Sequence, residues 1–240
     1  MARFLLVHGA WHGAWCWSPL SERLRRQGHE VLAIDLPGVG EAPERVGQVS
    51  LEDCARAIIT ATASRPVWLV GHSLGGAVIT AAAAMRPRLF HALVYVAAGA
   101  PLAGETHLQA LGLGPAGRAI AKMTIDAERK VAGLARRDRL EAFYNRCPPP
   151  LAAWAVAAGA TWQALGPATE PLPALPPDEM ARFYVRCSRD QTIPQETQAA
   201  MCKRLAWTAT ATLDADHSPF LSDPVGLAMT LARFERLAVA

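Results

Sequence analysis

Short runs of apolar residues alternate with longer amphipathic stretches along most of the chain. The runs are nearly continuous in apolar side chains, which is typical of strands that are buried on both faces of a parallel sheet. Because helix-length segments lie between them, the pattern predicts an α/β fold with helices on both faces of the sheet. The predicted strands are Phe4 to Val7, Val31 to Ile34, Val67 to Val70, Ala92 to Val96, Phe183 to Cys187 and Ala209 to Leu213.

Residues that favour helix ends separate these strands. Ser50 is placed to cap the helix that follows it, Gly28 to end the first helix, and Asp223-Pro224 to begin the last one. The other predicted helices are Trp17 to Gln27, Leu51 to Ala63, Gly76 to Met85 and Thr192 to Leu205.

The alternation fails between residues 101 and 177. This interval is rich in glycine, proline, alanine and tryptophan, contains Pro148-Pro149-Pro150, and shows only broken helical periodicity. We therefore predict a core formed by residues 1–100 and 178–240, with a mainly helical cap inserted at 101–177.

Composition narrows the classes of partner. The net charge of the 240 residues is only +3, and the arginines are scattered among acidic residues, so we expect no nucleic-acid partner. The cysteines number five and have no metal-like spacing, so we expect no disulfide framework, no metal site and no cofactor. Phe4 to Val7 is too short for a signal-peptide core, and alanine-rich segments such as Leu151 to Ala158 are too short to span a bilayer. We expect a cytoplasmic protein with no membrane partner, and leave a homodimer open.

The most informative motif is Gly71-His72-Ser73-Leu74-Gly75, between a predicted strand and the helix from Gly76. A strand that passes through G-x-S-x-G into a helix is the setting in which the serine is a nucleophile on a tight turn. Such a turn strains the serine backbone and needs neighbours with almost no side chain, which the glycines provide. Ser73 is therefore the candidate nucleophile.

A serine nucleophile needs a general base and a carboxylate that orients it. His217 follows the last predicted strand, at the same carboxyl edge of the sheet as Ser73, where ligands gather in parallel sheets. Asp190 follows the strand Phe183 to Cys187 and is the preferred carboxylate. Its rivals are Asp214 and Asp216; Asp216 ranks low because side chains of adjacent residues usually diverge, whereas Asp214 stays open.

An oxyanion formed at the substrate carbonyl needs at least two donors. The backbone N–H of Leu74, directly after the nucleophile, is one candidate. The second is expected from the loop after the first strand, where Gly9 lets the chain turn inward and Ala10 presents its N–H.

Four segments together resemble the α/β-hydrolase superfamily, and more narrowly its branch of plant methylesterases, hydroxynitrile lyases and related bacterial esterases. They are His8 to Trp17 (HGAWHGAWCW), Asp35-Leu36-Pro37-Gly38, Gly71 to Gly76, and Asp216-His217-Ser218-Pro219-Phe220. The resemblance covers essentially the whole chain and implies a six-stranded, mostly parallel core. In the lyases of this branch a lysine follows the catalytic histidine and a threonine lies in the first loop. Here Ser218 and Gly9 take those places, which favours ester hydrolysis.

We predict a serine esterase that cleaves a small, largely apolar carboxylic ester through an acyl-enzyme on Ser73. Two alternatives stay open: a hydroxynitrile-lyase-like carbon–carbon lyase, and a weakly catalytic ligand-binding protein on the same scaffold. Apolar residues of the cap are expected either to form the pocket over Ser73 or only to pack the cap on the core. The candidate pocket residues are Gly9, Trp11, Trp154, Trp162 and Ser218, with Leu111, Met123 and Phe143.

Overall fold

A six-stranded sheet forms the centre of the computed structural model, which describes residues 1–40, 43–112 and 122–239. Its strand order is β2-β1-β3-β4-β8-β9, and every neighbouring pair runs parallel. The strands are β1 (Arg3–Val7), β2 (Glu30–Ile34), β3 (Val67–His72), β4 (Phe90–Val96), β8 (Ala181–Cys187) and β9 (Ala209–Leu213). The α/β fold and the predicted strands are confirmed, with ends that move by two residues at most.

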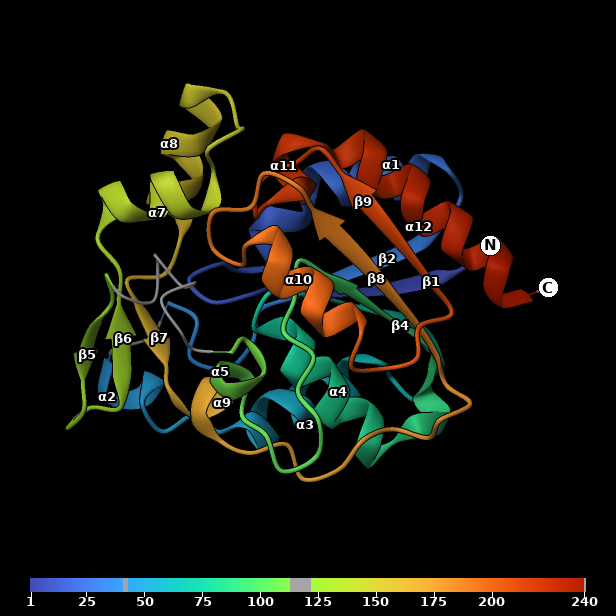
Figure 1. The fold of residues 1–240 in the computed structure, drawn as a ribbon, viewed down its shortest axis with the longest axis horizontal. Helices are drawn as coiled ribbons and strands as arrows, with labels where there is room; N and C mark the ends of the chain where they lie inside the picture. Colours follow the sequence, from blue (N-terminus) through green and yellow to red (C-terminus); the bar gives the residue numbers. More distant parts are fainter. Residues whose placement is uncertain (41–42, 113–121, 240) are drawn as a thin grey trace.

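Helices cover both faces of this sheet, as Figure 1 shows. Alternate residues of a strand point to opposite faces, so Phe4 and Leu6 join one hydrophobic cluster while Leu5 and Val7 join the other. One face carries α1 (Ser18–Arg26), α11 (Pro219–Ser222) and α12 (Pro224–Val239). The other carries α3 (Leu51–Ala61), α4 (Gly75–Met85) and α10 (Gln195–Cys202). Burial on both faces explains why the central strands read as continuous apolar runs.

The helix ends follow from local chemistry. Ser50 caps α3 by accepting a hydrogen bond from the Asp53 N–H, and the Asp53 carboxylate accepts one from the Ser50 N–H in return. The predicted helix Trp17 to Gln27 is α1, one residue shorter at each end, and a short 3-10 helix, Ala14–Trp17, precedes it. Two further short helices are α2 (Pro43–Val46) and a 3-10 turn at Pro87–Leu89.

The segment 101–177 contains helices and a second sheet. The structure does not describe its residues 113–121. Its strands β5, β6 and β7 pair in antiparallel fashion and were not predicted, because each is only three residues long. The elements are α5 (His107–Ala110), β5 (Thr124–Asp126), β6 (Val131–Gly133), α7 (Arg136–Phe143), α8 (Pro149–Ala158), β7 (Trp162–Ala164) and α9 (Gly166–Thr169).

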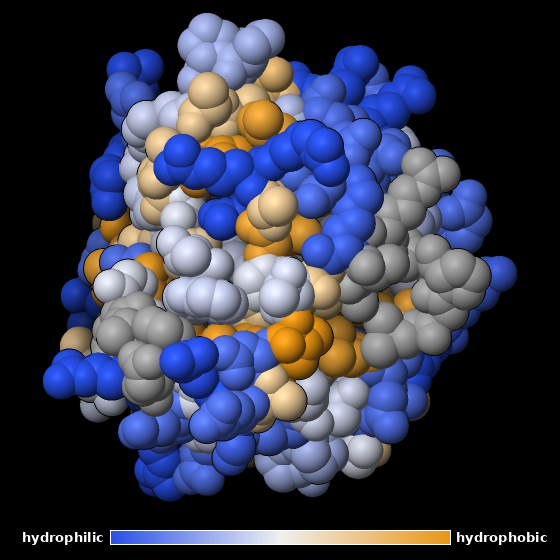
Figure 2. Space-filling model, turned by 90° about the vertical axis from the view of Figure 1, so that its left-hand side faces the viewer, coloured by the Kyte–Doolittle hydropathy of each residue, from blue (hydrophilic) through white to orange (hydrophobic). Residues whose placement is uncertain are grey.

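The small sheet, α7 and α8 lie beyond the carboxyl ends of the central strands, on the left of Figure 1. Figure 2 shows this side of the molecule, where patches of apolar surface lie among hydrophilic residues. The segment thus lies over the edge of the sheet where parallel α/β folds bind ligands. No helix within the described ranges is long and apolar enough to cross a membrane.

Gly76 of α4 packs closely against the segment that follows β4. A Cβ built there would meet the carbonyl oxygen of Gly99 at less than any normal contact distance, and would lie 2.9 Å from the Cβ of Ala98. We expect Gly76→Ala to lower the free energy of unfolding by about 1–3 kcal/mol, because overpacking outweighs the roughly 1 kcal/mol that alanine gains over glycine in a helix. Urea denaturation measures this difference.

Thr60→Ala, at an exposed position of α3, is the control. Its effect on unfolding should stay within about 0.5 kcal/mol, as is usual for the surface. A Gly76→Ala protein as stable as the control would contradict the packing argument.

Candidate active site

Ser73 lies in the turn between β3 and α4 and has a left-handed backbone, with φ of +53°. A Cβ on Gly71 would lie 2.6 Å from the carbonyl oxygen of Gly75, and one on Gly75 would lie 2.9 Å from the carbonyl oxygens of Val7 and His8. Only glycine fits at both positions. A non-glycine residue in this conformation costs about 1–3 kcal/mol, which the surrounding packing has to offset.

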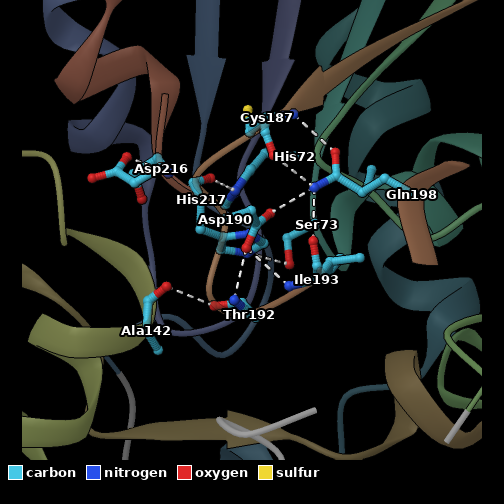
Figure 3. A network of polar contacts seen from close by, with 12 residues as sticks. His72, Ser73, Ala142, Cys187, Asp190, Thr192, Ile193, Gln198, Asp216 and His217 are labelled. Atoms are coloured by element: carbon cyan, nitrogen blue, oxygen red, sulfur yellow. Dashed lines mark hydrogen bonds and ion pairs between the residues drawn. The ribbon is translucent and has the colours of Figure 1, made fainter. Parts of the chain in front are cut away.

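Two hydrogen bonds join Ser73, His217 and Asp190. The Oγ of Ser73 lies 3.0 Å from Nε2 of His217, and Nδ1 of His217 lies 2.7 Å from Oδ2 of Asp190. Because a carboxylate can only accept, Nδ1 carries the proton and Nε2 is free to accept from the hydroxyl. The structure thus brings together the three side chains that the sequence analysis proposed, from the ends of β3, β8 and β9 (Figure 3).

The side chain of Asp190 is fully buried, yet both its carboxylate oxygens have donors. Oδ1 accepts from the N–H groups of Thr192 at 2.7 Å and Ile193 at 2.9 Å. Oδ2 accepts from Nε2 of Gln198 at 3.2 Å in addition to His217. These bonds hold the carboxylate in one orientation. The helix α10 starts at Gln195 and not at Thr192, because Pro194 before it has an extended backbone, with ψ of 154°.

Gln198 is a functional candidate that the sequence did not suggest. It is fully buried in α10, and its Oε1 accepts from the N–H of Cys187 at 2.9 Å. Its Nε2 donates to the carbonyl oxygens of Cys187 and Ile193 as well as to Asp190. Gln198 therefore joins the end of β8 to the turn that carries Asp190, as Figure 3 shows. A single glutamine in the first half of a polar helix carries no sequence signal that would predict this role.

The rival carboxylates face elsewhere. Asp216 is buried, but its oxygens accept from the N–H groups of Arg146 and Ser218 and from the hydroxyl of Ser222. Figure 3 shows its carboxylate apart from the pair of Asp190 and His217. Asp214 is 61% exposed at its side chain and pairs with Arg189 at 2.6 Å. The side chain of Asp190 is the one in contact with His217.

The backbone N–H groups of Ala10 and Leu74 donate no hydrogen bond within the described part of the chain. Both residues line the same cavity as Ser73. Leu74 directly precedes the helix α4, whose first N–H groups and dipole favour negative charge. The two N–H groups are therefore available to an oxygen atom bound beside Ser73.

Neutral histidines surround this arrangement. Nε2 of His72 donates to the carbonyl oxygen of His217 at 2.7 Å, and burial holds the pKa of His72 well below its ordinary value. Nδ1 of His12 donates to the carbonyl oxygen of Ala10 at 2.8 Å, and burial lowers the pKa of His12 to about 3. Both rings therefore fix backbone around Ser73 without adding charge. Within residues 1–40, 43–112 and 122–239, no three His, Cys, Asp or Glu side chains are placed to hold a metal ion together.

A cavity of about 280 Å³ opens at Ser73. Its walls are mainly apolar and come from the core and from the segment 101–177. Its lining includes six residues named in the sequence analysis, either as oxyanion candidates or as pocket candidates: Ala10, Trp11, Leu74, Leu111, Met123 and Phe143.

Four other pocket candidates are not among the residues that line this cavity. Trp154 is 47% exposed and packs edge-on against Trp15, with ring centroids 5.1 Å apart. Trp162 and Gly9 line a separate, much smaller cavity beside His8. Ser218 is fully buried, and its Oγ lies 3.4 Å from Nε2 of His12. Gly9 still matters for Ser73, because a Cβ there would lie 2.7 Å from the Cβ of Ser73.

Trp11 ties the segment 101–177 to the loop that carries Ala10. Its φ is +58°, and its N–H donates to Oε1 of Gln163 at 3.1 Å. Its indole Nε1 donates to the carbonyl oxygen of Ala132 at 3.3 Å, while its own carbonyl oxygen accepts from the N–H of Ala160 at 3.1 Å. Three bonds thus hold a strained residue between the cavity wall and the first loop.

Comparisons with known proteins agree with this architecture. Residues 4–230 match the family described as the alpha/beta hydrolase family. The chain is 43% identical over 110 residues to a carbendazim hydrolyzing esterase of Nocardioides sp. (strain SG-4G), a match that covers 44% of this chain and 46% of the relative. It is 37% identical over 103 residues to methyl jasmonate esterase 1 of Vitis vinifera, covering 41% of this chain and 40% of that one. The matched part of the chain spans less than half the length of these curated relatives.

Solved structures match over almost the whole chain. A pyrethroid hydrolase from Sphingobium faniae JZ-2 has 25% identity and a TM-score of 0.85, covering 98% of this chain and 97% of that one. The methylesterase MES16 from Arabidopsis has a TM-score of 0.83 and covers 98% and 99%, and at 22% identity it supports the fold alone.

The buried histidines predict how stability depends on pH. Burial lowers the pKa of His12 to about 3 and that of His107 to about 4, whereas both bind protons near pH 6.5 when unfolded. The unfolded state therefore takes up more protons as the pH falls from 6.5, so stability is lost in that direction. Between pH 7 and pH 5 we expect the free energy of unfolding to fall by about 2 kcal/mol for each of the two residues. Urea denaturation at both pH values measures the fall.

His107→Gln should remove the contribution of His107, about 2 kcal/mol, from this decrease in the free energy of unfolding, because glutamine does not titrate. His91→Gln, at an exposed position, is the matched control and should leave the fall unchanged. Equal stability of the unaltered protein at the two pH values would rule out the buried neutral state.

Proposed function

The chain belongs to the alpha/beta hydrolase family, and on this basis we propose that it is a carboxylic ester hydrolase with Ser73 as its nucleophile. The observation that carries the proposal is the continuous set of hydrogen bonds from Ser73 through His217 to Asp190, beside a cavity lined by two free N–H groups. Each group of an acyl-transfer site thus has a candidate at a suitable distance.

In the first half of the reaction, Oγ of Ser73 attacks the ester carbonyl carbon while Nε2 of His217 takes its proton. The carbonyl electrons move to the oxygen, and the N–H groups of Ala10 and Leu74 donate to this oxyanion. Asp190 stabilises the imidazolium through Nδ1. When the tetrahedral intermediate collapses, the bond to the leaving oxygen breaks and His217 gives its proton to the departing alcohol. The acyl group stays bound to Ser73 as an ester.

The second half uses the same groups. Nε2 of His217 takes a proton from a water molecule, whose oxygen attacks the acyl carbonyl, and the oxyanion forms again between Ala10 and Leu74. Collapse breaks the bond to Oγ of Ser73, which recovers its proton from His217. The products are a carboxylic acid and the free enzyme.

The cavity supports a small, largely apolar ester. At about 280 Å³ it suits a compact molecule, and its walls are mostly the hydrocarbon and aromatic side chains of Trp11, Leu111, Met123 and Phe143. The segment 101–177 supplies the last three residues named and so acts as a cap that selects the substrate. Relatives named as esterases and a neighbour named as a pyrethroid hydrolase are in keeping with this substrate class.

Carbon–carbon lyase chemistry has weaker support. Gly9 has no side chain to offer, and Ser218 is turned toward His12, away from the cavity. A ligand-binding protein without turnover would not need the three hydrogen-bonded side chains beside the cavity.

Ser73→Ala tests the proposal directly. We expect the wild type to hydrolyse 4-nitrophenyl butyrate, and the variant to lose about 10⁴-fold or more in kcat, because the nucleophile acts as a unit with its base. Ser18→Ala, an exposed serine on α1, is the control and should keep full activity. Release of nitrophenol is followed by absorbance.

A serine-directed phosphonate separates an esterase from a binding protein. Intact mass should increase by one adduct in the wild type and in Ser18→Ala, and should not change in Ser73→Ala. An unmodified wild-type protein would favour the binding function.

The choice of carboxylate has its own test. Asp190→Asn should lower kcat by about 10³–10⁴-fold, because an amide no longer selects the tautomer of His217 that accepts the serine proton. Asp214→Asn changes an exposed carboxylate in the same way and should leave kcat within about threefold. Steady-state kinetics on one ester compares the two, and equal losses would reject the assignment of Asp190.

A further inference from the structure

His107 is a buried polar residue of the cavity that the mechanism above does not use. It begins the short helix α5, is only 5% exposed, and lines the cavity together with Ser73. Neither of its ring nitrogens forms a hydrogen bond with a described residue, and Nδ1 is fully buried. Buried polar groups in proteins are nearly always paired, so an unpaired imidazole at a cavity wall points to a ligand.

The other polar side chains of the cavity wall already have partners. Ser73 is bonded to His217. The hydroxyl of Thr192 donates to the carbonyl oxygen of Ala142 at 2.8 Å. Gln163 accepts from the N–H of Trp11 at 3.1 Å and donates to the carbonyl oxygen of Ala164 at 3.2 Å. Among the polar side chains that line this cavity, His107 is the one that has no hydrogen-bond partner among the described residues.

The backbone of Gly99 sets the position of the ring. A Cβ on Gly99 would collide with Nδ1 and Cε1 of His107, so this edge of the ring rests on the glycine. The N–H of Gly99 donates to the carbonyl oxygen of Ser73 at 3.2 Å, which places His107 one layer of packing from the nucleophile. Nε2 takes no part in this contact and, unlike Nδ1, is not fully buried, so it is the ring nitrogen available to a ligand in the cavity that His107 lines.

Local structure around His107 holds the ring in place. Thr106 and Gln109 form a capping box at the start of α5, and the N–H of Leu111 donates to the carbonyl oxygen of His107 at 3.2 Å. A residue fixed in this way is preorganised for one ligand geometry and loses little conformational freedom when the ligand binds.

The charge state of His107 restricts the chemical class of group that it can bind. Burial is the larger cause and the nearby His217 the smaller cause that together lower the pKa of His107 to about 4. The imidazole is therefore neutral at ordinary pH. A neutral imidazole offers one donor and one acceptor. It is suited to a hydroxyl or a second carbonyl oxygen and provides no counter-ion for a carboxylate.

We propose that His107 determines substrate specificity by forming a hydrogen bond, through Nε2, to a neutral hydroxyl or carbonyl group of the substrate other than the scissile ester. This inference rests on the proposed esterase function and names its substrate class more closely: an ester that is mostly apolar and carries one further neutral polar group.

Methyl phenylacetate and its 2-, 3- and 4-hydroxyphenyl analogues test the proposal. The methylene group separates the ring from the ester, so the hydroxyl changes hydrogen bonding more than carbonyl reactivity. We expect the wild type to favour at least one hydroxy isomer over the parent ester in kcat/KM by about 3- to 10-fold, the range of one net hydrogen bond. Both kcat/KM and the dissociation constant, from quenching of tryptophan fluorescence in a Ser73→Ala background, are measured.

The variants isolate the hydrogen bond. In His107→Phe, which keeps a ring against Gly99, the preference for the hydroxy isomer should fall to about 1. His107→Leu is a second apolar replacement if phenylalanine does not fit. His107→Gln retains a donor and an acceptor and should restore part of the preference. His91→Gln, a histidine replaced on the surface, should keep it in full.

The two hypotheses fail in different ways. If the wild type shows no preference among the four esters, or if His107→Phe retains it, the role of His107 is overturned while hydrolysis of the parent ester still supports the esterase. If no ester is hydrolysed, the proposed function fails, and the dissociation constants alone decide whether His107 selects the hydroxyl.

Discussion

The tight turn at Ser73 is the constraint on which the site depends. A strand that passes directly into a helix forces Ser73 into a left-handed backbone and brings α4 against the first strand and against Gly99. That closeness excludes side chains at Gly71, Gly75 and Gly76. In return the hydroxyl of Ser73 stands free at the carboxyl edge of the sheet, with the N–H of Leu74 beside it. Strain in the turn is offset by the buried packing of α4.

The partners of Ser73 come from loops that are far apart in the sequence. Because all the strands of the sheet are parallel, the loops after β1, β3, β8 and β9 leave the same edge. Buried side chains then hold these loops in place. Gln198 fixes the turn of Asp190, and His72 and His12 hold the backbone of His217 and Ala10. Burial keeps both rings neutral, so protonation at low pH would place a charge in the buried surroundings of Ser73, and this links the geometry of the site to pH.

Sequence reasoning failed mainly in the segment 101–177. The strands β5 to β7 are too short to show alternation, and the pairing of β6 with β7 joins residues about thirty positions apart. The sequence left open whether Trp154 and Trp162 line the pocket or only pack the cap on the core. Trp154 packs on Trp15 at the surface, while Phe143 and Met123 reach the cavity. Which face of a short element turns inward depends on its neighbours, and these are not local in the chain.

The sequence by itself determined the class of fold, the nucleophile motif and the chain order of serine, aspartate and histidine. These are local or periodic features: apolar runs, glycines around one serine, and loops that follow predicted strands. Only the tertiary structure decided that Asp190 contacts His217 while Asp214 and Asp216 do not, and that Gln198 and His107 face the site. The physical reason is that side-chain hydrogen bonds and cavity walls depend on distances of a few ångströms between segments that only packing brings together.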